Sequence, residues 1–298
     1  AQLEKAQLSE KELVYIRNKK ELNADADLFV FDRLGLVAAV LFRGKKDTLY
    51  EQMEVLRRKG ARLLDKLKEE LIDEVFLADL SDEPSMLLAL AEGIMLAAYQ
   101  FSKYKTEKKE PYTLHLNVVD NKISSQEINE LKLVVEAVFL SRDLVNEPVS
   151  TLNAEKLGQI ILETARDYGF EAEVFNKKKI EALKMGGLLA VNQGSIDPPT
   201  FSVLEWKPEN ARNKKPVVLV GKGVVFDTGG TNLKTPPGSL DTMKSDMGGA
   251  AAVIGALTAI AANKLPVYVI GLIPATDNRI GGNAIVPGDI ITMHSGTT

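Results

Sequence analysis

The order of apolar and polar positions in the first half of the chain predicts strands alternating with helices. Apolar runs at 24–32 and 37–42 have the length and composition of strands. Residues 48–71 place leucine and methionine at helical spacing, with lysine and glutamate on the opposite face, so they predict an amphipathic helix. The further elements predicted in this half are a strand at 74–80, an apolar and therefore buried helix at 84–99, and a strand at 114–119.

The longest helical pattern of the chain runs from Ser124 to Asn146, where apolar residues recur at helical spacing. Pro148 ends this pattern, and a new helix is predicted after Asn153, which is expected to be its N-cap. We place a domain boundary at this break. The predicted parts are an N-terminal α/β domain at 1–123, a linking helix at 124–150 and a second domain at 151–298.

The second half of the chain alternates between strand and helix patterns more regularly. Such alternation predicts an α/β sheet with helices on its faces. The predicted elements are a helix at 154–168, a strand at 171–175, a helix at 178–183, strands at 188–192, 200–206 and 217–226, a helix at 248–263, and strands at 267–273 and 287–293.

Composition narrows the kinds of chemistry that are open to this chain. With 298 residues, 45% of them hydrophobic and 26% charged, it has the profile of a globular protein with room for two domains. It contains no cysteine, which excludes disulfides, thiolate zinc sites and cysteine nucleophiles. A metal ion would therefore be held by oxygen and nitrogen ligands. The net charge of −4 argues against a surface built for nucleic acid.

Targeting signals do not stand out in the sequence. The longest apolar stretches are shorter than a membrane-spanning helix, and the first residues are charged and lack the apolar core of a signal peptide. We therefore expect a cytoplasmic protein with no membrane partner. Because the sequence begins at Ala1 rather than methionine, we also expect that its first residues were removed or are not included.

The chain has only two histidines, His115 and His294. His115 alternates with leucines in a strand pattern, which favours an ordinary strand position over catalysis, and His294 lies in a polar tail. A general base of the imidazole type is therefore not expected. Catalysis would rest on lysine, aspartate, glutamate, a metal ion or the backbone.

The stretch 221–252 gathers the residues best suited to chemistry. Lys222 stands between two glycines after an apolar run, although a lysine is rarely buried unless it is paired. Asp227 precedes Thr-Gly-Gly, where glycines let a backbone approach a ligand, but aspartate is also common in turns. Asp246 comes before a run of small residues that opens a helix, where it could be a plain N-cap.

Taken together, these residues predict a site for hard divalent cations. Carboxylate oxygens suit such ions, and a lysine amine can become a nitrogen ligand once the metal displaces its proton. Two cations could polarise a carbonyl group and generate a hydroxide, and Lys234 would add an electrophile. The competing interpretation, a phosphate-binding loop built on the same glycines, is disfavoured because the spacing fits neither the P-loop nor the dinucleotide fingerprint.

Several motifs in this half resemble those of a known family. VGKGVVFDTGG, NLK, MKSDMGGAAAVIGAL and ATDNRIGGNAIVPGDI are similar, in order and spacing, to the catalytic half of the leucyl aminopeptidase (cytosol aminopeptidase) family. RDLVNEP, MGGLLAVNQGS and EWKP resemble the same family upstream, so the resemblance extends from about Leu140 to the end of the chain. The preceding region is similar to the family only in length and α/β character.

This resemblance implies a fold, an activity and an assembly. The family fold is a smaller N-terminal α/β domain joined by a long helix to a catalytic α/β domain with a central mixed sheet. Its members hydrolyse N-terminal residues, preferably leucine-like ones, from peptides with water activated by two divalent metal ions, commonly zinc or manganese and in some cases magnesium. They are typically homohexamers. The expected partners of this chain are therefore peptide substrates and further copies of itself.

The resemblance also implies a role for each candidate residue. Lys222 and Asp227 match metal ligands, with the aspartate bridging both ions, and Asp246 matches a ligand of the tightly bound metal. Lys234 matches the lysine that polarises the scissile carbonyl and stabilises the oxyanion.

Two departures from the family pattern affect these expectations. The segment TPPGSLDTMKS is one residue longer than the commonest family form. The second motif of the family, NTDAEGR, is absent from the chain; it supplies an aspartate and a glutamate to the metals and an arginine that holds a bicarbonate thought to act as base. We therefore expect a fragment that binds metal weakly and lacks peptidase activity, whereas the full-length protein has it.

A non-catalytic relative with a structural or DNA-associated role is the alternative hypothesis. The net charge gives DNA binding no electrostatic support. Sequence beyond Thr298 would discriminate, because intact acidic ligands and the arginine favour the enzyme and their replacement favours the scaffold. A phosphate-binding domain would instead show nucleotide-dependent stabilisation that persists in chelator.

Overall fold

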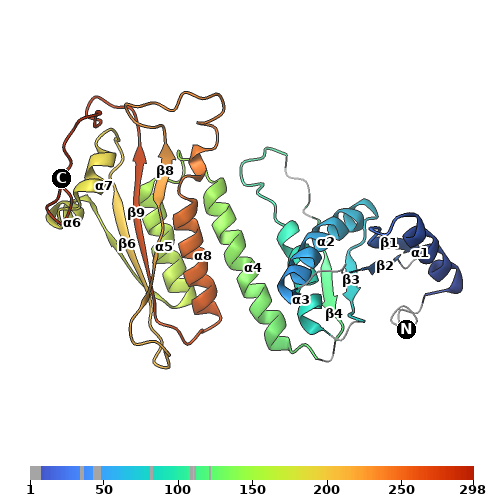
Figure 1. Cartoon of the computed structure of the whole chain (residues 1–298). Helices are drawn as coiled ribbons and strands as arrows, with labels where there is room; N and C mark the ends of the chain where they lie inside the picture. The colour runs from blue at the N-terminus through green and yellow to red at the C-terminus, as the bar shows by residue number, and fades with distance from the viewer. Residues whose placement is uncertain are drawn as a thin grey trace. The chain divides into compact units, whose positions relative to one another are not determined.

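A computed structural model of the chain describes residues 8–33, 37–42, 48–80, 83–107, 110, 112–120 and 122–298 (Figure 1). The chain divides into two compact units, Ala1–Val135 and Glu136–Thr298. The division falls inside the long helix α4, Ser125–Asn146. This helix confirms the longest helical pattern of the sequence.

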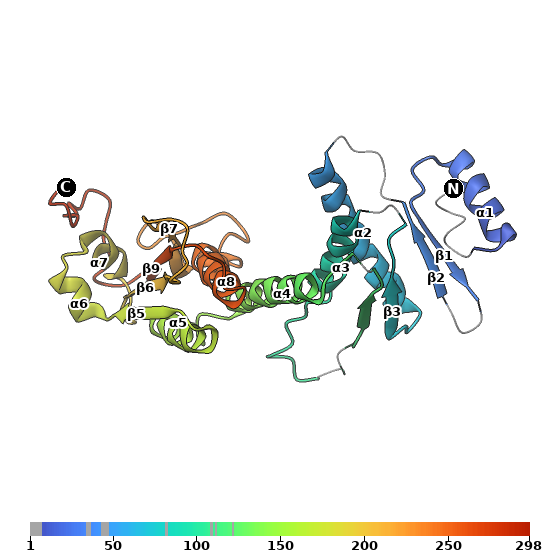
Figure 2. The ribbon, with the colours of Figure 1, turned by 90° about the horizontal axis from the view of Figure 1, so that it is seen from below.

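The first unit begins with a helix and a hairpin. Helix α1, Glu10–Leu22, starts at a capping box. The Ser9 side chain accepts a hydrogen bond from the backbone amide of Glu12, and the Glu12 side chain accepts one from the backbone amide of Ser9. Strands β1, Leu28–Asp32, and β2, Val37–Leu41, pair antiparallel, and α1 lies along them (Figure 2). The apolar pattern did not predict α1, because only one residue of this polar helix is buried.

The other elements of the first unit form a two-stranded sheet with two helices packed together. Strands β3, Glu74–Leu77, and β4, His115–Val118, pair in parallel. Helices α2, Leu49–Glu69, and α3, Pro84–Ala97, were both expected from the apolar pattern. Their buried leucines and methionine form the core of this unit with Leu77 of β3.

The second unit is built on a five-stranded mixed sheet. The order of strands is β5-β6-β9-β7, and β8 also pairs with β9. The antiparallel pairs are β5 with β6 and β6 with β9, whereas β7 and β8 run parallel to β9. The expected α/β fold with a central mixed sheet is therefore confirmed. The strands are β5 Glu171–Phe175, β6 Thr200–Trp206, β7 Val217–Val220, β8 Gly223–Asp227 and β9 Val269–Asn278.

Strands β7 and β8 follow one line along β9 with a break between them. Val220 lies opposite Leu272, and Gly223 lies opposite Ala275, so the register is continuous across the break. The sequence predicted a single strand here. The ladder is interrupted at the glycine and lysine that follow Val220, and this interruption creates the candidate site described below.

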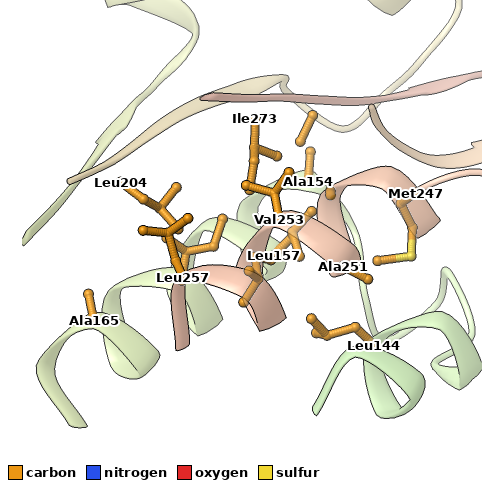
Figure 3. Close-up of a cluster of buried hydrophobic side chains, with 14 of the residues drawn as sticks. Leu144, Ala154, Leu157, Ala165, Leu204, Met247, Ala251, Val253, Leu257 and Ile273 are labelled. Atoms are coloured by element: carbon orange, nitrogen blue, oxygen red, sulfur yellow. The ribbon is translucent and has the colours of Figure 1, made fainter. Parts of the chain in front are cut away.

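Two helices cover the apolar face of this sheet. Helices α5, Ala154–Tyr168, and α8, Gly248–Ala262, bury their apolar side chains against β6 and β9, together with Leu144 of α4 (Figure 3). The cap predicted for α5 is confirmed, because the Asn153 side chain accepts from the Lys156 backbone at 2.9 Å.

The structure contradicts two predicted strands. Residues Gly186–Asn192 form the short helix α7, which follows helix α6, Lys177–Ala182. The run LLAVN is too short for its period to separate a strand from a buried helix. Residues 287–293 form no strand; this segment packs across α7, where a Cβ on Gly186 would lie 1.7 Å from the carbonyl oxygen of Thr292. Among the described residues, no helix has both the length and the apolar character needed to cross a membrane.

Candidate functional site

The candidate site begins where β7 breaks and β8 ends. Lys222 occupies the break, and Asp227 is the last residue of β8. In sheets of this kind, the loops that bind ligands follow the carboxyl ends of parallel strands. Although it follows an apolar run, the Lys222 side chain is 57% exposed.

The first turn of α8 packs directly against this break. The backbone amide of Ala250 donates to the Lys222 carbonyl oxygen at 2.9 Å. Gly221 makes this approach possible, since a Cβ there would lie 2.7 Å from the carbonyl oxygen of Gly249. The contact fixes the start of α8, and the residues just before it, beside Lys222.

Asp246 precedes α8 and pairs with Lys222. It follows the short 3₁₀ turn η2, Met243–Ser245, and its carboxylate oxygens lie 2.9 and 2.8 Å from Lys222 Nζ. Asp246 is not the N-cap of α8, because the capping residue is Met247 and no side chain caps the helix. The alternative that Asp246 is a plain helix cap is therefore wrong, because its carboxylate pairs with Lys222 and caps no backbone group of α8.

Asp227 is held by three donors. Its Oδ1 accepts from the Gly229 backbone at 2.9 Å and from Asn278 Nδ2 at 2.7 Å, and its Oδ2 accepts from Lys234 Nζ at 2.6 Å. Burial raises the pKa of the Asp227 carboxyl, but the hydrogen bonds from Lys234, Gly229 and Asn278 outweigh it and leave the pKa below its usual value. The carboxylate is therefore ionised at neutral pH.

A glycine turn brings Lys234 back to Asp227. Gly229 and Gly230 have φ values of 89° and 64°, a region that residues with a side chain rarely adopt. The turn closes when the Lys234 backbone donates to the Thr228 carbonyl at 2.9 Å. Lys234 Nζ also lies 3.0 Å from Met243 Sδ, so it bridges the loop after β8 and the turn η2.

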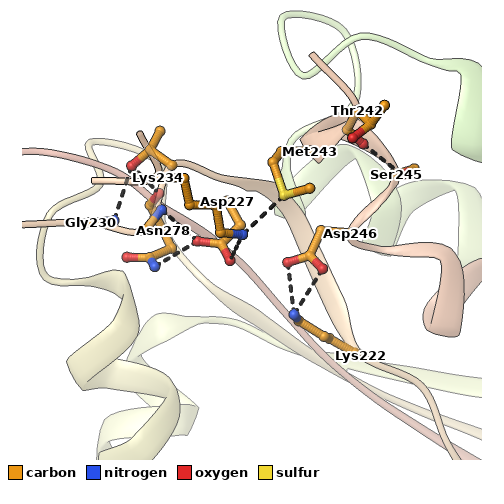
Figure 4. Close-up of polar contacts among 11 residues, drawn as sticks. Lys222, Asp227, Gly230, Lys234, Thr242, Met243, Ser245, Asp246 and Asn278 are labelled. Carbon is orange, nitrogen blue, oxygen red and sulfur yellow. Dashed lines mark hydrogen bonds and ion pairs between the residues drawn. The ribbon is translucent and has the colours of Figure 1, made fainter. Parts of the chain in front are cut away.

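The structure brings all four predicted residues into one region, as two lysine–carboxylate pairs (Figure 4). Sequence reasoning missed Asn278 and Met243, which contact Asp227 and Lys234. The only signal for Asn278 was its place after an apolar run, in the motif ATDN. Met243 carried no signal, because its role depends on the path of a loop.

The donor set suits a divalent cation. Two carboxylates and a lysine amine are the oxygen and nitrogen ligands expected in a chain without cysteine. Each of the two carboxylates is paired with a lysine ammonium group. Within the described part of the chain, no group of three or more histidines, aspartates and glutamates comes together. These residues therefore fit part of a metal site.

Comparison with known proteins identifies the family. The profile of the catalytic domain of the cytosol aminopeptidase family matches residues 139–298, which is more than half of the chain. The chain belongs to the cytosol aminopeptidase family. The profile of the family's N-terminal domain matches residues 37–108, a region where the sequence itself had shown only a general resemblance.

Curated relatives support the assignment. A probable cytosol aminopeptidase of Chlorobium limicola is 46% identical over 237 residues, covering 73% of this chain and 46% of its own length. A probable cytosol aminopeptidase from Clostridium perfringens is 39% identical over 256 residues, which cover 82% of this chain and 52% of the relative's own length. The chain thus spans about half the length of these relatives.

Solved structures share the fold of this family member. The bottromycin maturation enzyme BotP in complex with Mn has a TM-score of 0.80 and 29% identity, covering 95% of this chain and 60% of that one. A mutant of tomato leucine aminopeptidase has a TM-score of 0.82 and 24% identity, and the match covers 95% of this chain and 56% of the tomato chain. At that identity, the second comparison shows the fold alone.

Proposed function

We propose that this chain is part of a metal-dependent aminopeptidase that releases N-terminal residues, preferably leucine-like ones, from peptides. The observation that carries the proposal is the pair of lysine–carboxylate contacts at the break and end of the β7–β8 line, in a chain of the cytosol aminopeptidase family. The proposed activity is that of the full-length protein.

Lys222, Asp227 and Asp246 would hold the metal, which we propose to be two divalent ions of zinc, manganese or magnesium. Bound ions of this kind polarise a carbonyl group and activate water for attack. Support for manganese comes from the bottromycin maturation enzyme BotP, whose structure is in complex with Mn. Lys222 would act as a ligand through its neutral amine, after losing a proton.

Lys234 has a different task in this proposal. Its ammonium group lies at the Asp227 carboxylate, and its side chain is 32% exposed, so it can reach a substrate. A fixed positive charge beside a scissile carbonyl stabilises the negative charge that develops on its oxygen. The Met243 contact keeps the ammonium group on the side of Asp227 that faces η2.

The described residues supply only two carboxylates to this site. We propose that further carboxylates, and an arginine that holds a bicarbonate base, come from other parts of the full-length protein. The chain of 298 residues would then lack peptidase activity by itself. We further propose that the full-length protein is a cytoplasmic homohexamer that acts on peptides and has no membrane or nucleic-acid partner.

The test is hydrolysis of leucine p-nitroanilide by the full-length protein with Mn²⁺, Zn²⁺ or Mg²⁺, and with chelator. We expect activity that requires metal and falls at least about 100-fold in Asp246→Asn, since a metal ligand is lost. Asp241→Asn is the matched control, because Asp241 is an exposed aspartate of the same loop. Full activity in chelator, or in Asp246→Asn, would overturn the proposal, and an inactive full-length protein that binds DNA would favour the non-catalytic alternative.

A further inference from the structure

Asn278 ends β9 and points its side-chain amide at Asp227, from which it is 51 residues distant in sequence. The amide nitrogen must be the atom that faces Asp227, because an ionised carboxylate only accepts hydrogen bonds. We propose that Asn278 is a positioning residue, which holds the Asp227 carboxylate in the orientation that receives a divalent cation. This inference rests on the proposed metal site and adds a residue to it.

The backbone of Asn278 is fixed independently of its side chain. Its carbonyl oxygen accepts from the Thr228 amide at 2.9 Å and from Thr228 Oγ1 at 2.8 Å. In the β8–β9 ladder, Asp227 lies opposite Asn278, after an irregularity that begins at Val224. The amide therefore approaches the carboxylate from a rigid strand rather than from a loop.

A glycine leaves room for the Asn278 side chain. A Cβ on Gly230 would lie 2.7 Å from Asn278 Oδ1, and Gly230 has a φ of 64°. The same turn that returns Lys234 to the site therefore also accommodates this amide. The Asn278 side chain, which is half-buried, thus lies between the glycine turn and Asp227.

The two carboxylate oxygens of Asp227 accept hydrogen bonds from different kinds of donor. Oδ1 receives two neutral N–H groups, from Gly229 and Asn278, and Oδ2 receives the ammonium group of Lys234. An incoming cation competes with the positive charge of Lys234, whereas the neutral amide of Asn278 brings no charge for it to replace. Asn278 thus fixes the rotation of the carboxylate and leaves Oδ2 for the cation.

The expected loss of metal affinity can be estimated from residues that hydrogen-bond metal ligands in other proteins. Groups that orient a metal ligand typically contribute 10- to 100-fold in metal affinity. Without the amide, Asp227 keeps one donor to Oδ1, the Gly229 backbone, and the carboxylate can turn. We therefore expect Asn278→Ala and Asn278→Leu to bind Mn²⁺ at least about 10-fold more weakly than wild type. Leucine keeps the branched shape of asparagine and removes both polar atoms of its amide, including the donor to Asp227.

The experiment is a titration of the full-length protein with MnCl₂, with free Mn²⁺ measured by electron paramagnetic resonance, beside thermal unfolding in EDTA. Asn263→Ala is the matched control, because it removes a half-buried amide whose Nδ2 donates to Ala259. A merely structural role would lower the thermal midpoint in EDTA without a selective loss of Mn²⁺ affinity.

Each outcome decides the inference. Weaker Mn²⁺ binding in both Asn278 variants, with a midpoint in EDTA close to that of Asn263→Ala, supports it. Wild-type Mn²⁺ affinity in either variant overturns the role of Asn278 and leaves the proposed function standing. A full-length wild-type protein that binds no Mn²⁺ at millimolar concentrations overturns the proposed metal site, and the role of Asn278 with it.

Discussion

The contact between the strand break and α8 makes a sharp prediction for Gly221→Ala. The new Cβ would lie 2.7 Å from the Gly249 carbonyl oxygen and 2.8 Å from the Ala250 Cα. Both are backbone atoms, so no side chain can turn away to relieve the overlap. The first turn of α8 must move, and the hydrogen bond from the Ala250 amide to the Lys222 carbonyl must lengthen.

The cost of this movement can be estimated from overpacked cores. An extra methyl group in a well-packed site destabilises a protein by about 1–3 kcal/mol. Gly221 has no positive φ, so its backbone accepts alanine and the penalty is purely steric. If the free energy of unfolding falls by about 2 kcal/mol per molar urea, the urea concentration at the unfolding midpoint should fall by roughly 0.5–1.5 M.

Trp206 gives a clean assay, because it is the single tryptophan of the chain and lies in β6 of the second unit. Its fluorescence therefore follows the unfolding of that unit in urea. Gly248→Ala is the control: a Cβ there meets nothing within 4 Å, so the variant should match wild type or gain a few tenths of a kcal/mol. An unchanged midpoint in Gly221→Ala would refute the close approach of α8 to the strand break.

Three further predictions follow from other parts of the structure. Leu257→Ala removes a fully buried side chain from the core of the second unit and should cost about 2–5 kcal/mol in the same Trp206 assay; a smaller loss would contradict that core. The Arg33 hydrogen bond lowers the pKa of Glu12 to about 2. The stabilisation of the folded state by the Glu12–Arg33 pair is therefore present above pH 4.5 and is lost as the pH falls toward 2. Circular dichroism melts should show this loss in wild type and a flatter profile in Glu12→Gln, and identical profiles would contradict it. Lys234→Met in the full-length protein should lower kcat for leucine p-nitroanilide by about 100-fold or more, and an unchanged kcat would remove its proposed role.

Local sequence patterns determined most of the helices and strands. Helix α4 and strands β5 and β6 were predictable because their apolar periods are long or cleanly bounded, and Asn153 marked the start of α5. The two helices that the sequence did not predict, α1 and α7, were missed for local reasons as well. Helix α1 buries a single residue and so has no apolar stripe to detect, and LLAVN in α7 is compatible with either structure.

The candidate residues were identified from sequence, but their partners were not. Lys222, Asp227, Lys234 and Asp246 fall within one stretch of turn-forming sequence, and their side-chain chemistry suggested a cation site. Which lysine meets which carboxylate depends on two backbone features. One is the glycine turn that returns Lys234 to Asp227, and the other is the docking of α8 at the strand break, which delivers Asp246 to Lys222.

Only the tertiary structure placed Asn278 in the site. Sequence by itself determined the family, the α/β class and the acidic and basic residues, because these depend on composition, local period and motif spacing. The contact between Asn278 and Asp227 joins residues 51 positions apart through the pairing of β8 with β9. A sheet register is set by packing across the whole sheet, so no local pattern in either segment specifies that contact.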